Sequence, residues 1–576
     1  MKSILSFSRI FLFLISIPAF PQASNISCSS PLAERVMLGT YSPTEFSAPL
    51  ISLRTDSLPA RLMNQISPDS IKAYTIRLAR YHNRNSGSDT LSALKGIGAA
   101  RRWIYQRFAG WSVASGNRLI PAYLNFNQAI CGINQHKNVL AVLPGTDTSD
   151  RSVVLIEGHM DSRCEGLCDT ACLAQGVEDN ASGTALTMEL VRVMAGLNLK
   201  RTLVFMITTA EEQGLYGAEA FADYAQAKGI KINAVQNNDV IGGIICGATA
   251  SAPGCSGLNS IDSLQVRLFS SGGANSKHKQ FARFVKLEYK ENIRPITPVK
   301  MLVSIMSPED RTGRGGDHIP FRQHGYAAIR FTSANEHGNA NVSLSSYSDR
   351  QHSSRDTLGV DKDGNAVIDS FFVDFNYLAR NAVINANAAC MAASGPLAPT
   401  LSAVLADTGK IAVFIPGQAP FRVGIRTVNN DWDSVYTISQ NSDTILLPYA
   451  NRYYVSAARV DSLGIESLFS SEITLVTTAT EKTLQNQMPE LLPNRPNPFD
   501  EATLISVFAG NKKTWKKAAL RISDIKGNIL KVLPIELKEG LNEILYEHGY
   551  NMQGILNCTL LLDGKPFQSR QMIFAN

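Results

Sequence analysis

The 576-residue sequence has no long run of basic residues and no internal repeat or low-complexity tract. Its net charge is +6, but Lys and Arg are scattered among Asp and Glu, which argues against a nucleic-acid partner because such binding needs a concentrated basic stripe. After the first residues, no apolar run is long enough to span a membrane. The composition, 44% hydrophobic and 18% charged, is typical of a globular protein, and the length suggests roughly three to four domains.

The N-terminal segment carries the pattern of an export signal. Lys2 and Arg9 precede an apolar run over residues 10–17, and small and helix-breaking residues follow. This run is too short to cross a bilayer, so residues 1–23 are predicted to be a secretory signal peptide. We therefore expect an exported protein, secreted or held at the cell surface.

The nine cysteines make disulfides plausible in an exported chain, and the odd number leaves at least one thiol unpaired. Cys246 and Cys255 bracket a short segment that they could close into a loop. Cys164, Cys168 and Cys172 lie four apart in RCEGLCDTAC. A thiolate metal site usually uses closer pairs and needs a fourth ligand, so we expect a disulfide that staples this loop, with one cysteine paired elsewhere.

The central part of the chain alternates helical and strand patterns. Apolar residues three or four apart predict one helix from Pro68, with Ser67 as its N-cap, and another over residues 97–108. Short apolar runs at 138–143, 153–156 and 203–207 predict buried strands, and a helix follows Asp179. This alternation indicates an α/β fold, a mixed and mostly parallel sheet with helices on both faces.

Side chains that can bind metal follow the short apolar runs of this region. They are His159, Asp161, Asp179, Glu211, Glu212 and Asp239. Taken singly, an acidic residue after a strand is most often a helix cap or a solvated turn residue. Imidazole and carboxylates gathered at strand ends of one α/β unit instead favour a zinc site for hydrolysis. His352 is the best candidate for a further ligand from a distant part of the chain.

The same residues divide into metal ligands, a residue that orients a ligand and a residue that accepts a proton. Asp161, two residues after His159, can accept the second ring N–H of that histidine and orient it. Asp179 lies where a carboxylate can bridge two cations. Because neighbouring side chains at a strand end point in different directions, one of Glu211 and Glu212 can bind metal while the other takes a proton from water.

Residues 66–393 resemble the co-catalytic zinc aminopeptidases, which include bacterial leucyl aminopeptidases and aminopeptidase Y and have glutamate carboxypeptidase II as a larger relative. The matching motifs are H-x-D at 159–161, EDNASG at 178–183, EEQGLYGA at 211–218, Asn-Asp at 238–239 and HSSRDT at 352–357. The resemblance implies an aminopeptidase acting on peptides with two Zn²⁺ ions. It implies that His159 and Asp239 share one ion, that Glu212 and His352 share the other, that Asp179 bridges them, that Glu211 is the general base, and that the Asp179–Asn180 peptide is cis.

Two alternatives to a peptidase remain open. The segment DHIPF, which contains Asp317 and His318, also occurs in glutaminyl cyclases of the same fold, so these two residues are expected in the substrate pocket. The intact DNASG and EEQGLYG motifs favour the peptidase. A non-catalytic surface adhesin is the second alternative, and the full set of ligands and base argues against it. The insertion RCEGLCDTACLAQ, between Asp161 and Asp179, is expected at the mouth of the site.

The flanking segments are predicted to be separate units. Residues 24–65 form an N-terminal extension whose role the sequence does not indicate. Residues 396–478 resemble a fibronectin type III module, with about seven short strands expected in a sandwich. Residues 489–576 resemble the C-terminal sorting domain of type IX secretion cargo, which implies the type IX secretion machinery as a partner. Two small all-β sandwich domains are therefore expected after the α/β domain.

Overall fold

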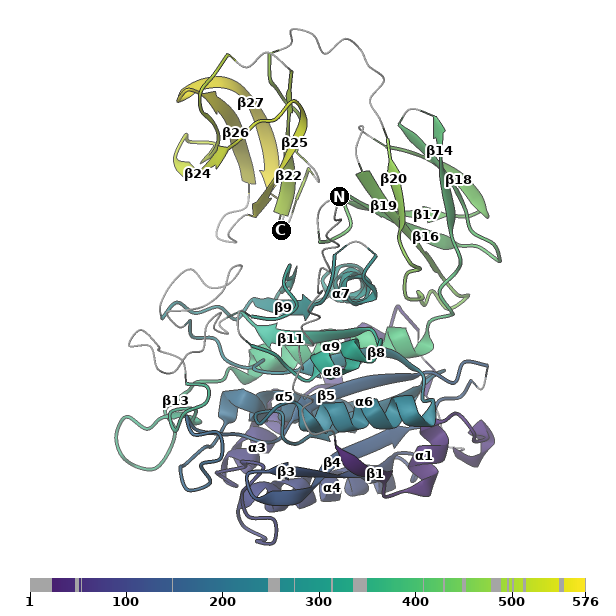
Figure 1. Ribbon diagram of the computed structural model, residues 1–576, viewed down its shortest axis with the longest axis vertical. Helices are drawn as coiled ribbons and strands as arrows, with labels where there is room; N and C mark the ends of the chain where they lie inside the picture. The colour runs from purple at the N-terminus through teal and green to yellow at the C-terminus, as the bar shows by residue number, and fades with distance from the viewer. Residues whose placement is uncertain are drawn as a thin grey trace, which may run out of the picture.

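The computed structural model (Figure 1) describes most of the chain outside its N-terminus. The described residues are 23–46, 51–52, 54–147, 149–246, 259–273, 275–311, 314–334, 350–407, 409–427, 430–447, 452–477, 488–494, 497–499, 502–510, 514–547 and 554–574. Residues 1–22 of the expected signal peptide lie outside this set, as does Cys255.

A nine-stranded mixed sheet forms the centre of the large domain (Figure 1), and it confirms the predicted fold class. The four central strands β7, β5, β8 and β11 are parallel neighbours, whereas antiparallel pairs extend the sheet from β7 through β4 and β3 to β1 and from β11 to β9. In spatial order the strands are β1 (Ser24–Cys28), β3 (Ile120–Ile130), β4 (Ile133–Leu143), β7 (Thr202–Thr208), β5 (Val153–His159), β8 (Ile232–Asn238), β11 (Ala328–Ser333), β9 (Gln265–Ser270) and β10 (Leu302–Ile305).

Helices cover both faces of this sheet. One face packs against α2 (Leu58–Gln65), α3 (Pro68–Ala79), α4 (Gly96–Ala114), α5 (Ser182–Met194), α7 (Lys277–Glu288) and α9 (Phe375–Ser394). The other packs against α1 (Pro31–Met37), α6 (Tyr216–Lys228) and α8 (His318–Gln323). Strand β5 is buried on both sides because Val154 and Ile156 face one helical layer while Val153 and Leu155 face the other. A strand buried on both faces needs an unbroken apolar run, which is what the sequence has there.

The first predicted helix begins where the sequence indicates. The hydroxyl of Ser67 accepts the N–H of Ser70, and Pro68 occupies the first turn of α3, where a missing N–H costs nothing. The apolar face with Ile71 and Leu78 is fully buried. The remaining short elements are β2 (Ile51–Ser52), β6 (Leu197–Asn198), β12 (Gly359–Val360), β13 (Ser370–Phe371), η1 (Pro43–Phe46), η2 (Val177–Ala181) and η3 (Tyr289–Ile293).

Residues of the expected N-terminal extension belong to the large domain. Strand β1 pairs antiparallel with β3 at the edge of the main sheet. Leu58 and Leu62 of α2 lie in the same buried cluster as α5 and α9. The described residues of 24–65 therefore complete an edge of this sheet and contribute a helix to each of its faces.

The first β domain follows α9 and consists of two antiparallel sheets. One holds β14 (Ser402–Asp407), β15 (Lys410–Phe414) and β18 (Ser442–Leu446); the other holds β17 (Ser434–Ile438), β16 (Phe421–Arg426), β19 (Arg452–Arg459) and β20 (Ile473–Val476). This domain lies beside α7 (Figure 1) and packs on the α/β domain. The rings of Trp432 and Phe469 are tilted by 39° to each other, with centroids 4.1 Å apart, inside the buried cluster of the α/β domain. Glu472 pairs with Arg283 of α7 at 3.0 Å and with Arg426 of its own domain at 2.6 Å.

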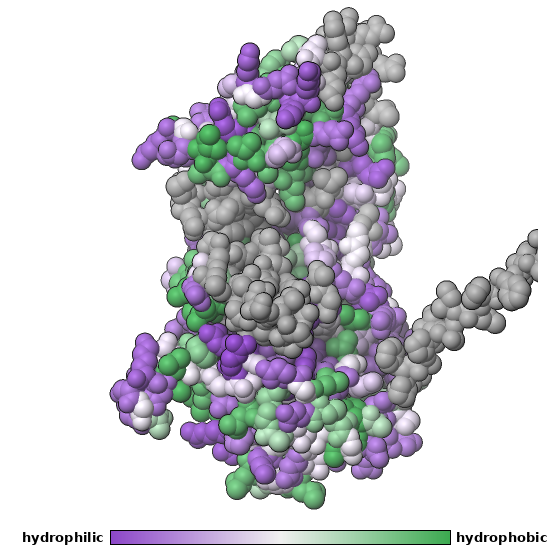
Figure 2. All heavy atoms as spheres, turned by 60° about the vertical axis from the view of Figure 1, so that its left-hand side comes forward, coloured by the Kyte–Doolittle hydropathy of each residue, from purple (hydrophilic) through white to green (hydrophobic). Residues whose placement is uncertain are grey.

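The second β domain, yellow in Figure 1, also has two antiparallel sheets. They are formed by β21 (Glu490–Leu491), β22 (Ala502–Ala509) and β25 (Gly540–Glu547), and by β24 (Ile529–Ile535), β23 (Ala518–Asp524), β26 (Gly554–Leu562) and β27 (Lys565–Phe574). Figure 2 shows apolar side chains in green among polar ones at the upper end of the molecule, where the second β domain lies. Exposed apolar residues of the second domain include Ile525, Ile529 and Val532. The fibronectin and sorting-domain identities stay predictions.

Candidate metal centre

The parallel strands β7, β5 and β8 bring the predicted ligands to one edge of the sheet. His159 ends β5 and pairs in register with Thr208, the last residue of β7, so the carboxyl ends of these strands lie level. Glu211 and Glu212 follow β7, and Asp239 follows β8. Functional sites of open α/β sheets form at this edge because the loops after the strands converge there.

Asp179 and His352 reach the same edge from loops. Asp179 lies just before α5, and its peptide bond to Asn180 is cis, as the family resemblance implied. Gly183, in the first turn of α5, allows this helix to approach β8, since a Cβ there would lie 2.0 Å from the carbonyl oxygen of Asn238. His352 comes from the segment between β11 and β12. Only the folded sheet places it near the other ligands.

The five predicted ligands form two groups that share Asp179. In the first group, Nε2 of His159 lies 3.2 Å from Oδ1 of Asp179 and 3.3 Å from Oδ1 of Asp239. In the second, Nε2 of His352 lies 3.1 Å from Oδ2 of Asp179 and 3.0 Å from Oε2 of Glu212. The two oxygens of Asp179 therefore face different histidines. Each group could hold one cation, with Asp179 between them.

The residues present fit zinc. Imidazole nitrogen and carboxylate oxygen are the donors that Zn²⁺ takes, and three donors per group leave a coordination position for water or substrate. Atom Oε1 of Glu212 is buried and has no hydrogen-bond partner among the described residues. A buried carboxylate oxygen without a partner is costly, and a cation would satisfy it.

Burial and charge act in opposite directions on the shared carboxylate. Burial alone raises the pKa of Asp179, but hydrogen bonds from His159 and His352 hold this pKa well below its ordinary value. Burial lowers the pKa of His159, but the carboxylates of Glu211 and Asp239 outweigh it and raise that pKa well above its ordinary value. The site is thus rich in negative charge and selects for positive charge.

Asp161 has a different set of partners from the one expected. Nδ1 of His159 lies 3.2 Å from the main-chain oxygen of Asp161 and 3.6 Å from its carboxylate. The carboxylate instead accepts the backbone N–H of Glu211 at 3.3 Å and that of Glu212 at 3.2 Å. Asp161 therefore orients His159 mainly through its backbone, and its side chain holds the turn that carries the two glutamates.

The adjacent glutamates occupy different places. Glu212 belongs to the second metal-capable group, whereas Glu211 belongs to neither. Burial raises the pKa of Glu211 well above its ordinary value, and the carboxylates of Asp239 and Glu212 raise it further against the opposing effect of His159. A raised pKa makes a carboxylate a better proton acceptor near neutral pH.

Asp317 and His318 are fully buried, and neither joins the two groups. Asp317 accepts a hydrogen bond from the hydroxyl of Thr208 at 2.5 Å, and burial raises its pKa to about 7. Nε2 of His318 lies 3.1 Å from the carbonyl oxygen of Glu309. Neither side chain is exposed to solvent. Their expected contact with substrate stays a prediction.

Two further residues, which were not predicted from the sequence, hold the ligands in place. Arg330, in the middle of β11, contacts Oδ2 of Asp239 at 2.9 Å. Nothing in the segment AIRFTS marks an arginine as buried. Asp356 accepts the backbone N–H groups of Glu178 and Asp179, each at 2.9 Å. The motif HSSRDT ends on this Asp and its Thr, so that motif was the available signal.

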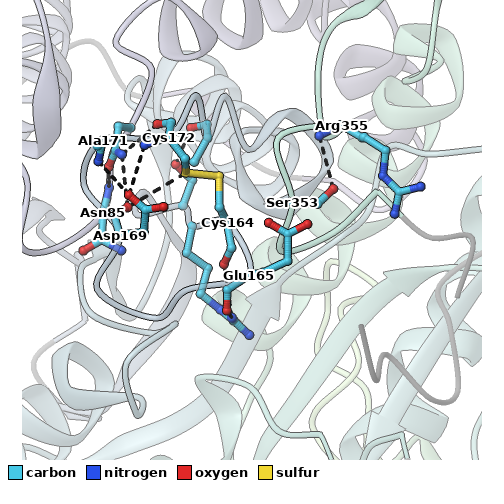
Figure 3. The surroundings of a disulfide bond; sticks show 12 residues. Asn85, Cys164, Glu165, Asp169, Ala171, Cys172, Ser353 and Arg355 are labelled. Carbon is cyan, nitrogen blue, oxygen red and sulfur yellow. Dashed lines mark hydrogen bonds between the residues drawn. A yellow bond between two sulfur atoms is a disulfide. The ribbon is translucent and has the colours of Figure 1, made fainter. Parts of the chain in front are cut away.

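The cysteine-rich insertion is stapled as predicted. Cys164 pairs with Cys172 (Figure 3), and Cys168 pairs with Cys131, which lies outside the insertion. Within the loop, the carboxylate of Asp169 accepts the N–H groups of Ala171 and Cys172 (Figure 3). Cys246 is disulfide-bonded as well. Its expected partner Cys255 lies outside the described residues.

Comparison with known proteins decides the family. The sequence model of peptidase family M28 matches residues 138–372, which contain all five candidate ligands. A protein of Pyricularia oryzae described as a "probable zinc metalloprotease" is 32% identical over 370 residues, covering 61% of this chain and 68% of that protein. One from Leptosphaeria maculans with the same description is 31% identical over 336 residues, covering 56% and 74%. The chain belongs to peptidase family M28.

Membership makes the chain a metallopeptidase, a hydrolase of peptide bonds. Solved structures similar to this M28 peptidase include the LapA aminopeptidase of Legionella pneumophila, with a TM-score of 0.42 and 18% identity over 59% of this chain and 74% of that one. Glutaminyl cyclase of Porphyromonas gingivalis has a TM-score of 0.39 and 15% identity over 56% and 98%. Among the described residues, no helix combines the length and the apolar character of a membrane span.

Proposed function

We propose that this M28 peptidase is an exported aminopeptidase that uses two zinc ions to release N-terminal residues from peptides. The observation that carries the proposal is the sharing of Asp179, whose two oxygens face His159 and His352 at 3.2 and 3.1 Å. A carboxylate held between two imidazoles, each with a further carboxylate beside it, suits a pair of cations.

The ligand assignment follows from the two groups. His159 and Asp239 would hold one zinc, Glu212 and His352 would hold the other, and Asp179 would bridge them. When bound, zinc supplies Lewis-acid polarisation of the scissile carbonyl and lowers the pKa of the attacking water. Arg330 holds the second oxygen of Asp239 at 2.9 Å, which leaves the first oxygen for metal.

Glu211 is proposed as the general base. Its carboxylate lies outside both groups, and burial raises its pKa, so it can take a proton from the attacking water and pass it to the departing amine. Asp161 fixes the position of this base through the backbone N–H of Glu211. Asp161 is therefore a positioning residue for both the base and the neighbouring ligand.

Export is part of the same proposal. The N-terminal segment has the pattern of a signal peptide, and the disulfides Cys131–Cys168 and Cys164–Cys172 suit an oxidising compartment. The resemblance of residues 489–576 to a sorting domain supports delivery by the type IX secretion machinery. Deleting these residues should leave peptidase activity intact but retain the protein in the periplasm. Normal surface display of the truncated chain would contradict the sorting role.

The proposed activity is tested with three substrates: an aminoacyl 4-nitroanilide, a peptide with a free N-terminus and a peptide that begins with Gln. We expect release of the N-terminal residue from all three, and loss of that release with a chelator. Cyclisation of the Gln peptide without release of any residue would favour the glutaminyl cyclase. A purified chain that binds no zinc and processes none of the substrates would favour the adhesin.

A further inference from the structure

The cysteine-rich insertion carries an arginine into the metal centre. Arg163 is the first residue of RCEGLCDTACLAQ, and it lies where the chain passes from the buried Asp161 and Ser162 to the exposed rim at 165–171. Its Nε donates to Oε2 of Glu212 at 2.8 Å, and its Nη2 lies 2.6 Å from Nδ1 of His352. Only 16% of the side chain is exposed. The guanidinium therefore faces the second metal-capable group rather than solvent.

A second arginine converges on the same histidine from another loop. Nη1 of Arg314 lies 3.0 Å from Nδ1 of His352. Both guanidinium groups thus contact one ring nitrogen, although like charges so close repel each other. The charge that balances Arg163 here is the carboxylate of Glu212. In the proposed zinc-loaded enzyme that carboxylate would be a metal ligand, which would leave two guanidinium groups beside the second metal-capable group, each with a planar fork suited to a carboxylate.

The loop that carries Arg163 is held at several points. The Cys164–Cys172 disulfide joins the residue next to Arg163 to the far end of the loop, and Cys131–Cys168 ties its middle to the turn between β3 and β4. The side-chain amide of Asn83 donates to the carbonyl oxygens of Asp169 and Cys172. Such anchoring lowers the cost of holding an arginine in one place for binding.

We propose that Arg163, with Arg314, forms a subsite for a substrate carboxylate next to the scissile bond, and that the disulfide-stapled insertion positions it. This inference rests on the proposed peptidase function and names its substrate class, peptides with a negative charge within one residue of the cleaved bond. The carboxylate can be an acidic side chain on either side of that bond or the free C-terminus of a dipeptide. The experiment separates these sources.

The test compares kcat/KM within three pairs of substrates that differ by one charge. They are aspartyl and asparaginyl 4-nitroanilide, leucyl-glutamyl amide and leucyl-glutaminyl amide, and leucylglycine and leucylglycinamide. In at least one pair we expect the charged member to be preferred about tenfold or more, which is the size of one charge-assisted hydrogen bond. The R163Q variant should bring that ratio close to one. The R163K variant keeps the positive charge but lacks the planar guanidinium group, and it should give an intermediate ratio. Because the ratio is taken within each variant, a change in zinc content cancels.

Two further variants separate positioning from general charge. Removing the staple with C164S/C172S should lower the ratio while Arg163 is still present. R355Q is the matched control, since Arg355 is exposed and its side chain points away from the Cys164–Cys172 disulfide (Figure 3); it should leave the ratio unchanged. Binding of leucyl-glutamyl amide and leucyl-glutaminyl amide to the E211Q variant, measured by calorimetry, gives the same comparison without turnover.

The outcomes separate this inference from the function on which it rests. Hydrolysis of all the pairs without preference, or a preference that R163Q leaves unchanged, would overturn the carboxylate subsite alone. Release of no residue from any substrate by the zinc-loaded wild-type enzyme would overturn the peptidase proposal as well.

Discussion

The carboxylate of Asp161 accepts the backbone N–H of Glu212 at 3.2 Å and so joins the end of β5 to the turn after β7. The same carboxylate accepts the N–H of Glu211, and the backbone oxygen of Asp161 lies 3.2 Å from His159. One residue thus sets the relative positions of a proposed base and two proposed ligands.

Replacing Asp161 by Ala removes this link without touching a proposed metal ligand. Residues that support ligands typically account for about 10- to 100-fold in metal affinity or activity, so D161A should lower kcat/KM or zinc affinity by about that factor. Steady-state kinetics and a zinc titration check both. Wild-type values in both measurements would show that the carboxylate does no positioning.

Substitutions of the two adjacent glutamates should have different effects on zinc content and kcat. E211Q should keep its zinc and lose about 10²- to 10⁴-fold in kcat, because the base is lost and the ligands are not. E212Q should lose zinc occupancy, since it removes one charged donor from the second group. Metal analysis beside kinetics makes the comparison. Equal zinc loss in both variants would contradict the separate roles.

Arg330 should matter for stability as well as for Asp239. It is fully buried and contacts Asp239 at 2.9 Å and Asp310 at 2.9 Å. R330M would leave two buried carboxylates without this cation, and breaking such a pair costs about 3–5 kcal/mol in the free energy of unfolding. R322Q is the control, because the Arg322–Glu309 pair is partly exposed and should cost less than about 1 kcal/mol. Denaturant unfolding of the chelated proteins compares them, and equal losses would contradict the argument.

The first β domain should stabilise the α/β domain. Glu472 is buried between Arg283 and Arg426, and E472A would leave both guanidinium groups without this carboxylate. We expect a loss of about 3–5 kcal/mol in the free energy of unfolding. In contrast, E490A removes only an exposed pair with Arg570, 4.0 Å long, and should change little. If E472A unfolded at the same denaturant concentration as the wild type, the interface would be weaker than its packing indicates.

Glu288 should make the folded state less stable as the pH rises. Burial raises its pKa in the folded chain to about 8, from an ordinary value of 4.5, although Asn292 donates a hydrogen bond to it. Between these two values the unfolded chain has lost the proton and the folded chain keeps it. Stability from this group is therefore complete below pH 4.5, falls by about 1.4 kcal/mol per pH unit and is lost as the pH passes 8.

The E288Q variant removes this titration with little change in shape. The difference in unfolding free energy between E288Q and the wild type should shift in favour of E288Q as the pH rises from 5 to 8. Denaturant unfolding at several pH values measures it. A difference that stays constant over this range would show that Glu288 is ionised in the folded protein.

The ligands could be predicted from the sequence because each follows a local pattern. His159 ends β5, Asp239 follows β8 directly, and Glu212 lies in the loop after β7. The carboxyl ends of parallel strands lie at the same edge of a sheet. The helix at Pro68 could be predicted equally well, since its cap and apolar face lie within a few residues of each other. Local signals of this kind do not depend on the rest of the fold.

Other features depend on contacts between distant segments. Arg330 has no distinctive pattern in the sequence. Its role comes from its contacts with Asp239, which follows β8, and with Asp310 in another loop. Cys168 pairs with Cys131 from 37 residues away, a partner that spacing within the insertion could not identify. Strand β1 had no strong pattern of its own and is defined by its pairing with β3. The arginines beside His352 likewise meet only in the folded chain.

The most direct test of the central claim measures peptide hydrolysis against zinc content in one preparation. Metal-free protein is titrated with Zn²⁺ while release of the N-terminal residue is followed from a peptide with a free N-terminus and from the same peptide N-acetylated. A two-zinc aminopeptidase should reach full activity at two zinc ions per chain and release the residue from the free peptide alone. Full activity without zinc, or equal cleavage of the acetylated peptide, would contradict it.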